Sequence, residues 1–495
     1  MIRRRLLAAL GSVLVLSGCG AVGLSVTPVT VQDFTNELVV PPLAESRVVD
    51  GTRIFTLTAK QGRSRFLPGT DTRTWGFDGA HLGPTLRAER GERVAVEVTN
   101  ALPEPTSVHW HGMHLPARMD GGPHQEIPPG DTWRPEWTVD QPAATLWYHP
   151  HPHGVSEEHV YRGLAGMFLI DDDAPVQLPH TYGVDDIPVI VQDKLFDTAG
   201  QLELADDGSE PGTLGNVVMA NGTVGAYRDV TTERVRLRLL NGSTARTYSL
   251  GFTDRRIDLV ATDGGLLDAP LSVERVRLAP GERAEIVVAL TPGDTTRLRS
   301  FPVDLGDVAA PFAMGGNDAF DVLELRAAPE LASTPPPSWG PSAHAPNDAL
   351  DETAVATTRT FELQERTING QRMDMSRIDE VVTIGHTEMW EVRNALPMPH
   401  SFHVHDVQFA IVSIDASPPP PDLAGRKDTV YLEPNRTYRL LMRFDDYPDP
   451  ATPYMYHCHM LLHEDEGMMG QFVVVLPGMP AAAPAPGVGH GGHHD

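Results

Sequence analysis

The chain has little positive charge for its length. Its 495 residues include 39 Lys and Arg against 66 Asp and Glu, which gives a formal net charge of -27 at pH 7. Phosphate groups would be repelled by such a protein, so the balance argues against a nucleic-acid partner. The acidic character fits a soluble protein that works outside the cytoplasm.

Long apolar runs are also scarce. The run Leu6–Leu16 follows the arginines at positions 3 to 5 and is too short to span a bilayer as a permanent helix. A positive start before a short apolar run is typical of an export signal. The run ends in Leu16-Ser17-Gly18-Cys19, which resembles the bacterial lipoprotein signal, whose cysteine is lipidated and becomes the mature N-terminus.

We therefore expect residues 1–19 to be a signal peptide that ends at Cys19. The mature protein would be exported and lipid-anchored on the outer face of the cytoplasmic membrane, in an extracellular or periplasmic location. No other membrane contact is expected. An ordinary cleaved signal, in which Cys19 is incidental, is the alternative, and the adjacent arginines leave open whether the Sec or the twin-arginine route is used.

Cysteine is scarce as well, since Cys19 and Cys458 are the only two. If Cys19 carries lipid, Cys458 has no partner. Exported proteins usually pair their cysteines or avoid them. A bound metal would shield the Cys458 thiolate from oxidation, so a metal ligand is a good reason to keep it.

Three stretches of the chain repeat one pattern. In each copy a charged turn leads through an apolar stretch to an asparagine, which is Asn100, Asn241 or Asn394. The distance from this asparagine to the motif that follows it is the same in all three copies. A second marker also recurs: Pro129-Gly130-Asp131, Pro280-Gly281-Glu282 and Pro434-Asn435-Arg436. Val94–Val98 and Val235–Leu239 alternate with period two, as half-buried strands do. Length and repeat predict an all-β chain of three sandwiches, at 35–175, 185–328 and 355–478.

Two segments lie outside the repeats. Residues 328–355 contain three consecutive prolines and are expected to be a linker. The Ala/Pro/Gly-rich tail, 479–495, ends in several histidines and is expected to be disordered. It could capture loose metal or simply aid solubility.

Four His-x-His pairs stand out among 21 histidines: His109/His111, His149/His151, His403/His405 and His457/His459. Residues i and i+2 of a strand project from one face, so each pair can present two imidazoles together. The pairs fall at equivalent places in the first and third copies, whereas the middle copy has Leu250 and Phe252. The fold itself therefore does not demand histidine there. We expect copies one and three to face each other around a shared metal cluster, rather than to hold eight unrelated core histidines.

The third copy has further candidate ligands. Cys458 lies between two of these histidines, so its side chain points to the opposite face of the strand. Its companions are His400, His463 and Met468. Two imidazoles, a thiolate and a weak thioether make a blue copper electron-transfer site. The first copy has other residues in the matching places: Thr106, Pro150, Val155 and Leu164. We predict one blue copper per chain, joined to the cluster by a short covalent path through Cys458.

Together these residues resemble the multicopper oxidase family, which includes laccases, bilirubin oxidases, spore-coat laccases and cuprous oxidases. Its four motifs are present in order: His109-Trp110-His111-Gly112, His149-Pro150-His151, His400-Ser401-Phe402-His403-Val404-His405, and His457-Cys458-His459 through His463 to Met468. The resemblance covers nearly the whole mature chain. It implies three tandem cupredoxin-like Greek-key domains, the middle one without copper.

The resemblance also implies four copper ions and their ligands. His400, Cys458 and His463 would bind the type 1 copper, with Met468 as axial ligand. His109 and His403 would bind the type 2 copper. The type 3 pair would be held by His111, His149, His151, His405, His457 and His459. Asp120 and Glu464 match acidic residues that bacterial members use as proton donors near the cluster.

The implied reaction couples one-electron oxidation of a donor to four-electron reduction of O₂ to water. The donor stays open. Cuprous oxidases carry a Met-rich insert before the third domain, but 328–355 contains no Met. Met373, Met375 and Met398 could line a soft-metal entrance or be apolar filler. Phenols, aromatic amines or a metal ion such as Cu(I) therefore remain candidates, and the protein is expected to be a monomer.

Three other functions are alternatives to oxidation of a donor coupled to O₂ reduction. Some bacterial relatives keep the fold, have lost the copper ligands and serve cell division, but the ligand set here is complete. Copper buffering without turnover is a second. Copper nitrite reductase is a third, disfavoured because three domains and all type 3 histidines lie in one chain.

Overall fold

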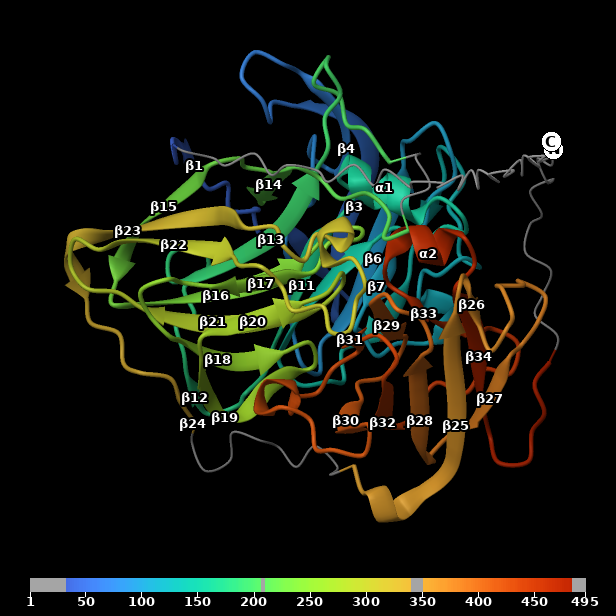
Figure 1. The fold of residues 1–495 in the computed structure, drawn as a ribbon. Coiled ribbons are helices and arrows are strands. Elements are labelled where there is room, and N and C mark those ends of the chain that lie inside the picture. The colour runs from blue at the N-terminus through green and yellow to red at the C-terminus, as the bar shows by residue number, and fades with distance from the viewer. Residues whose placement is uncertain (1–32, 206–209, 340–349, 483–495) are drawn as a thin grey trace, which may run out of the picture.

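The computed structural model describes residues 33–205, 210–339 and 350–482. The predicted signal peptide, Cys19 and most of the predicted tail lie outside these ranges. The described chain is almost entirely β-structure in three successive sandwiches (Figure 1). The predicted all-β fold class is therefore confirmed. Within the described residues, no helix is long and apolar enough to cross a membrane.

The first sandwich packs two sheets around a core that includes Trp110 and Trp137. Its strands are β2 (Ser46–Val49), β3 (Thr52–Ser64), β4 (Thr72–Phe77), β5 (Leu86–Glu89), β6 (Arg93–Asn100), β7 (His109–His111), β8 (Thr132–Trp133), β9 (Glu136–Thr138), β10 (Ala144–His149) and β11 (Gly166–Asp171). One sheet has the order β2-β3-β6-β8 and the other β5-β11-β10-β7.

The middle sandwich has two six-stranded sheets and a core of its own. Its strands are β1 (Asn36–Glu37), β13 (Asp186–Lys194), β14 (Val217–Ala220), β15 (Ala226–Thr232), β16 (Arg234–Asn241), β17 (Tyr248–Gly251), β18 (Ile257–Thr262), β19 (Gly265–Val273), β20 (Arg275–Leu278), β21 (Arg283–Ala289), β22 (Thr295–Ser300) and β23 (Phe320–Ala332). β16, predicted to be half-buried, is buried on both faces. Its Arg238 is accommodated by ion pairs with Asp186 and Glu285.

The third sandwich has two five-stranded sheets around a core that includes Trp390. Its strands are β25 (Val355–Gln364), β26 (Thr367–Ile368), β27 (Glu380–Thr383), β28 (Thr387–Asn394), β29 (His400–Val404), β30 (Ala410–Ile414), β31 (Thr429–Leu432), β32 (Thr437–Arg443), β33 (Tyr454–Cys458) and β34 (Met469–Val475). The described helices are α1 (Ser156–Arg162) and α2 (Leu461–Asp465), which lie side by side, and the 3-10 turns η1 (Ala117–Met119), η2 (Pro311–Met314), η3 (Glu352–Ala354) and η4 (Pro421–Leu423).

The asparagine that recurs in the sequence has the same structural role in each sandwich. It ends the strands β6, β16 and β28 and is fully buried. Its side-chain amide donates to two backbone carbonyls across the following loop, as Asn100 does to Glu104 (2.8 Å) and Ile127 (2.7 Å). Asn241 and Asn394 repeat this pattern. The buried loop carbonyls are thereby satisfied, which fixes the segment that follows.

Two boundaries differ from the expected ones. The sequence repeat predicts that residues from 35 onward belong to the first sandwich, but the described chain starts in the middle one, because β1 pairs in parallel with β15. The expected linker, 328–355, also contains regular structure. β23 continues to Ala332, and β24 (Ser338–Trp339) pairs with β12 (Val176–Gln177), where the Trp339 indole donates to the Leu267 carbonyl. Neither pairing has a local sequence signal, since each joins segments more than 150 residues apart.

Candidate metal centre

Histidines from the first and third sandwiches meet at one place. β7 supplies the first pair and β10 ends at His149, whose cross-strand neighbour is His109. In the third sandwich β29 and β33 are paired in the same way, with His403 opposite His457. The repeat in the sequence is therefore a repeat in geometry. All eight imidazoles are 1% exposed or less.

Ring nitrogens of this histidine cluster point at one another, both within each sandwich and across the interface between the first and third. The Nε2 atoms of His109 and His403 lie 3.4 Å apart. His457 Nε2 lies 3.2 Å from His151 Nε2 and 3.3 Å from His405 Nε2. His149 Nε2 lies 3.4 Å from His111 Nδ1, and the His459 ring packs 4.9 Å from His111 and 5.2 Å from His149, centre to centre.

These spacings fit bound metal ions. When two nitrogens bind the same first-row metal ion at about 2.0 Å and at a tetrahedral angle, they lie about 3.3 Å apart. Burial holds the pKa of His403 and His405 well below its usual range and lowers that of His459 to about 3, so the rings stay neutral with a lone pair available. Neither ring nitrogen of His459 has a hydrogen-bond partner among the described residues. Without ions, several buried acceptors would face each other unsatisfied.

For four of the eight rings, a backbone carbonyl fixes which nitrogen faces the centre. The Nδ1–H groups of His109, His149 and His403 donate to the carbonyls of Asp120, Pro150 and Asp428, at 3.0, 2.8 and 2.8 Å. His457 Nδ1–H donates to the Cys458 carbonyl at 3.1 Å. The Nε2 lone pair of each ring is thus left for a metal, as is usual for histidine ligands.

The two carboxylates singled out in the sequence both touch this cluster. Asp120, after η1, places Oδ2 2.7 Å from His405 Nδ1 and Oδ1 3.3 Å from His109 Nδ1. Glu464, on α2, places its two oxygens 3.1 Å from Nδ1 of His151 and of His457. Both are 1% exposed. Each is in position to hold or pass a proton at these imidazoles.

A second group of ligand atoms lies on the other face of β33. Cys458 Sγ is 3.4 Å from His400 Nδ1 and 3.5 Å from His463 Nδ1, and these nitrogens are 3.1 Å apart. Met468 is fully buried in the same core, and its backbone N–H donates to the His463 carbonyl. Burial raises the pKa of the Cys458 thiol to about 12, so a metal ion must displace its proton. We call these four residues the cysteine site.

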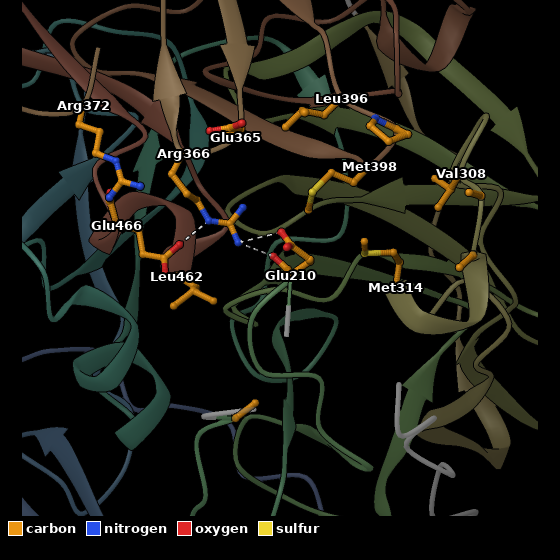
Figure 2. A pocket seen from close by; sticks show the side chains of 14 residues that line it. Glu210, Val308, Met314, Glu365, Arg366, Arg372, Leu396, Met398, Leu462 and Glu466 are labelled. Carbon is orange, nitrogen blue, oxygen red and sulfur yellow. Dashed lines mark hydrogen bonds and ion pairs between the residues drawn. The ribbon is translucent and has the colours of Figure 1, made fainter. Parts of the chain in front are cut away.

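A cavity of about 930 Å³ lies against the cysteine site. Glu210 lines the cavity and connects it to the cysteine site, because the Glu210 carbonyl accepts a hydrogen bond from His463 Nε2 at 2.7 Å. Arg366 bridges Glu210 and Glu466 across the cavity (Figure 2). Met398 and Met314 line it as well, whereas Met373 and Met375 do not. The cavity is therefore separated from the His463 ring by a single hydrogen bond.

Sequence reasoning missed two residues that touch the cluster. Asp428 Oδ1 and Thr429 Oγ1 lie 3.1 and 2.9 Å from His111 Nε2. Asp428 also contributes to a group of potential metal-binding atoms with His111 and His403. The only local signal is a charged Lys427-Asp428 pair before an apolar strand, which by itself points to no function.

Three multicopper oxidase family profiles match the chain, at residues 58–175, 209–297 and 345–477. The multicopper oxidase Mco of Staphylococcus haemolyticus is 35% identical over 89% of this chain and 92% of its own. The cell division protein FtsP of Salmonella typhimurium is 35% identical over 88% and 92%. The laccase-like multicopper oxidase CueO of Ochrobactrum superposes with a TM-score of 0.79, at 34% identity over 88% of this chain and 100% of the other. This neighbour has oxidase activity towards lignin model compounds and lignosulfonate.

Proposed function

Since this chain belongs to the multicopper oxidase family, and is thus a cupredoxin-like copper oxidoreductase that uses O₂, we propose a four-copper division of labour for its two sites. The cysteine site would hold one type 1 copper through His400, Cys458, His463 and Met468. His109 and His403 would hold the type 2 copper. The type 3 pair would be held by His111, His149, His151, His405, His457 and His459.

When bound, the coppers would supply one-electron transfer from a donor and four-electron reduction of O₂. Four donors each lose one electron, and O₂ with four electrons and four protons gives two waters. The chain contributes the link between the sites, because Cys458 is the direct neighbour of His457 and His459 in the backbone. This adjacency, with Cys458 facing one site and both histidines the other, is the observation that carries the proposal.

Copper content, colour and product together test it. Copper-loaded protein is expected to hold four ions per chain, to be intensely blue from the thiolate-bound copper, and to consume one O₂ for every four one-electron donors oxidised. A colourless protein, or O₂ uptake that yields hydrogen peroxide, would contradict this assignment.

The donor is proposed to bind in the cavity beside the cysteine site. The thioethers of Met314 and Met398 can take a soft metal ion such as Cu(I), and the carboxylates of Glu210 and Glu365 suit a harder ion such as Mn(II). Val308, Leu396 and Leu462 offer apolar surface for a phenol or aromatic amine. A panel of phenols, an aromatic amine, Cu(I) and Mn(II), with O₂ uptake as readout, separates these donors.

The double variant Met314→Leu/Met398→Leu sharpens that comparison. If Cu(I) is a donor held by these thioethers, we expect its KM to rise about tenfold, which corresponds to about 1.4 kcal/mol, while KM for a phenol changes little. Met373→Leu, outside the cavity lining, is the matched control. Unchanged Cu(I) kinetics in the double variant would remove the thioethers from donor binding.

The 35% sequence identity to the cell division protein FtsP favours a second candidate, a non-enzymatic role in cell division. The complete ligand set counts against this role. All twelve candidate ligands are present, and the rings or the sulfur of eleven of them lie next to another candidate ligand. A protein that binds no copper and takes up no O₂ with any donor would favour the FtsP-like role. Copper binding without O₂ uptake would favour copper buffering.

Export and lipidation at Cys19 complete the proposal. Cys19→Ala is expected to shift the protein from the membrane fraction to the soluble one, because a lipid on this cysteine would be the anchor. Wild-type protein already in the soluble fraction would instead favour an ordinary cleaved signal, and a variant that stays with the membrane would contradict an anchor at Cys19. We also propose that the exported protein is a monomer.

A further inference from the structure

The middle sandwich holds none of the candidate copper ligands, yet its turn between β20 and β21 reaches the histidine cluster. This turn, residues 279–282, leads into Arg283, which is fully buried. The guanidinium of Arg283 donates to both carboxylate oxygens of Asp428, from the third sandwich, at 2.6 Å each. Such a two-point pair fixes both the position and the plane of the carboxylate.

Asp428 and its neighbour in turn hold two rings of the cluster. Asp428 Oδ1 lies 3.1 Å from His111 Nε2, and Thr429 Oγ1 lies 2.9 Å from the same nitrogen. His111 Nε2–H donates to these two oxygens. The lone pair of His111 Nδ1 is thus left facing His149. The four rings held by backbone carbonyls present Nε2 instead, so His111 has the opposite orientation. The Asp428 carbonyl accepts from His403 Nδ1 at 2.8 Å.

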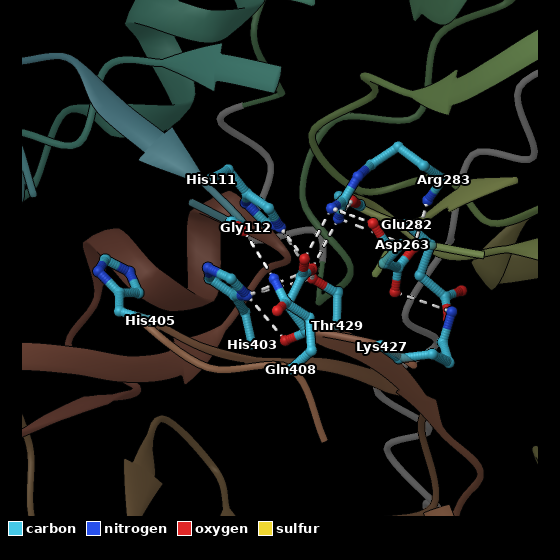
Figure 3. Close-up of polar contacts among 12 residues, drawn as sticks. His111, Gly112, Asp263, Glu282, Arg283, His403, His405, Gln408, Lys427 and Thr429 are labelled. Atoms are coloured by element: carbon cyan, nitrogen blue, oxygen red, sulfur yellow. Dashed lines mark hydrogen bonds and ion pairs between the residues drawn. The ribbon is translucent and has the colours of Figure 1, made fainter. Parts of the chain in front are cut away.

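Arg283 is itself held rigidly. Its Nε–H donates to the Thr145 carbonyl (2.9 Å) and its backbone N–H to Asp263 Oδ1 (2.7 Å). Lys427 completes the group, with Nζ 2.8 Å from Asp263 and 3.2 Å from Glu282. Figure 3 shows these charges packed between β21 and the strand that follows Lys427. A buried carboxylate such as Asp428 stays in place only when it is paired and hydrogen-bonded.

Two glycines allow the chain segments around the Arg283–Asp428 pair to approach one another closely. A Cβ on Gly281, which has a φ of +86°, would lie 3.0 to 3.1 Å from the His459 ring. A Cβ on Gly112, beside His111, would lie 2.5 Å from Asp428 Oδ2 and 2.7 Å from Arg283 Nη2. Pro280 adds a carbonyl that accepts from Ser401 Oγ at 2.9 Å. The three sandwiches are therefore close-packed at this point.

We infer that Arg283 is a positioning residue for the type 2 and type 3 coppers: by fixing Asp428 it sets the orientation of His111 and the place of His403. The ligand-free sandwich is thus part of the copper site and not merely a spacer. This inference rests on the proposed function, in which His403 and His111 are copper ligands.

The test uses full-length, copper-loaded protein in four forms: wild type, Arg283→Met, Arg283→Lys and Arg246→Met. Arg246 is the matched control, since it is also buried in the middle sandwich, and in the described part of the chain its partners Asp193 and Asp318 form no ion pair with a histidine of the cluster. Copper content, the paramagnetic resonance signal of the type 2 copper, the blue absorption, kcat and KM for the donor, and Tm are measured.

We expect Arg283→Met to weaken type 2 copper binding about 10- to 100-fold, the usual effect of losing an outer partner of a ligand. Copper content should fall from four towards three, with the type 2 signal lost or altered, kcat reduced, and the blue absorption and donor KM retained. Arg283→Lys keeps the charge and should recover part of the signal. Arg246→Met should lower Tm but leave the type 2 signal intact.

Asp428→Asn supplies a second measurement in case Arg283→Met folds poorly. If Arg283 acts through Asp428, adding Arg283→Lys to Asp428→Asn should change the type 2 signal no further. An unaltered type 2 signal and copper content in both Arg283 variants would overturn the inference while leaving the proposed function standing. A wild-type protein without a type 2 signal would instead contradict the proposed function itself.

Discussion

Cys458→Ser is expected to remove the blue colour and to reduce O₂ uptake to background. The thiolate gives a blue copper site its intense absorption, and the serine hydroxyl is a poor ligand for the same ion. Cys458 Sγ lies within 3.5 Å of both candidate imidazoles of its site, and Cys458 is the only cysteine among the described residues, so no second thiolate can take its place. The measurements are the visible spectrum, copper content and O₂ consumption with a phenol and with Cu(I).

The loss should be confined to one copper. Because the histidine cluster lies on the other side of β33, the variant is expected to bind three coppers and keep a type 2 resonance signal. Met469→Leu is a matched control, since Met469 neighbours Met468 but lies in β34 opposite His457. Retained blue colour in Cys458→Ser would remove Cys458 as the ligand on which the whole assignment depends.

Asp120→Asn and Glu464→Gln are expected to lower kcat by about 10²- to 10⁴-fold, the range for loss of a positioned proton donor. Both changes keep the shape of the side chain and remove its capacity to hold a proton. Asp120 contacts His405 and His109, and Glu464 contacts His151 and His457, so the two act on different parts of the cluster.

The defect should appear only in the reaction with O₂. With O₂ excluded, the donor should bleach the blue absorption at the wild-type rate, and recolouring on readmission of O₂ should be slow. Asp465→Asn is the control, because Asp465 neighbours Glu464 but accepts from the backbone of Ser156 and Glu157 instead of an imidazole. Equal slowing of bleaching and recolouring would show a general disturbance of the copper sites.

The ligand atoms could be predicted from the sequence because their pattern is local. Alternation in a strand puts His109 and His111 on one face, and Cys458 on the face opposite its two neighbours. The repeat then aligned the first and third copies, since the same histidine positions carry Leu250 and Phe252 in the middle copy. Asp120 and Glu464 were found only through the resemblance to a family.

The residues that sequence reasoning missed are joined by long-range contacts. Arg283 meets Asp428 across 145 positions of the chain, and each residue taken alone is an ordinary charged residue beside an apolar strand. The same holds for β1, which pairs across the chain with β15. No periodicity or spacing within one segment reports such pairings, because they depend on how whole sandwiches pack.

The sequence by itself determined the strand character of this protein, its threefold repeat and the identity of the candidate ligand atoms, because these follow from side-chain alternation and residue chemistry within short segments. Only the tertiary structure decided which atoms meet, where the cavity beside the cysteine site opens and how the middle sandwich holds Asp428 against His111. Those features arise where surfaces distant in the chain are buried together, and buried charges there must find partners wherever the packing places them.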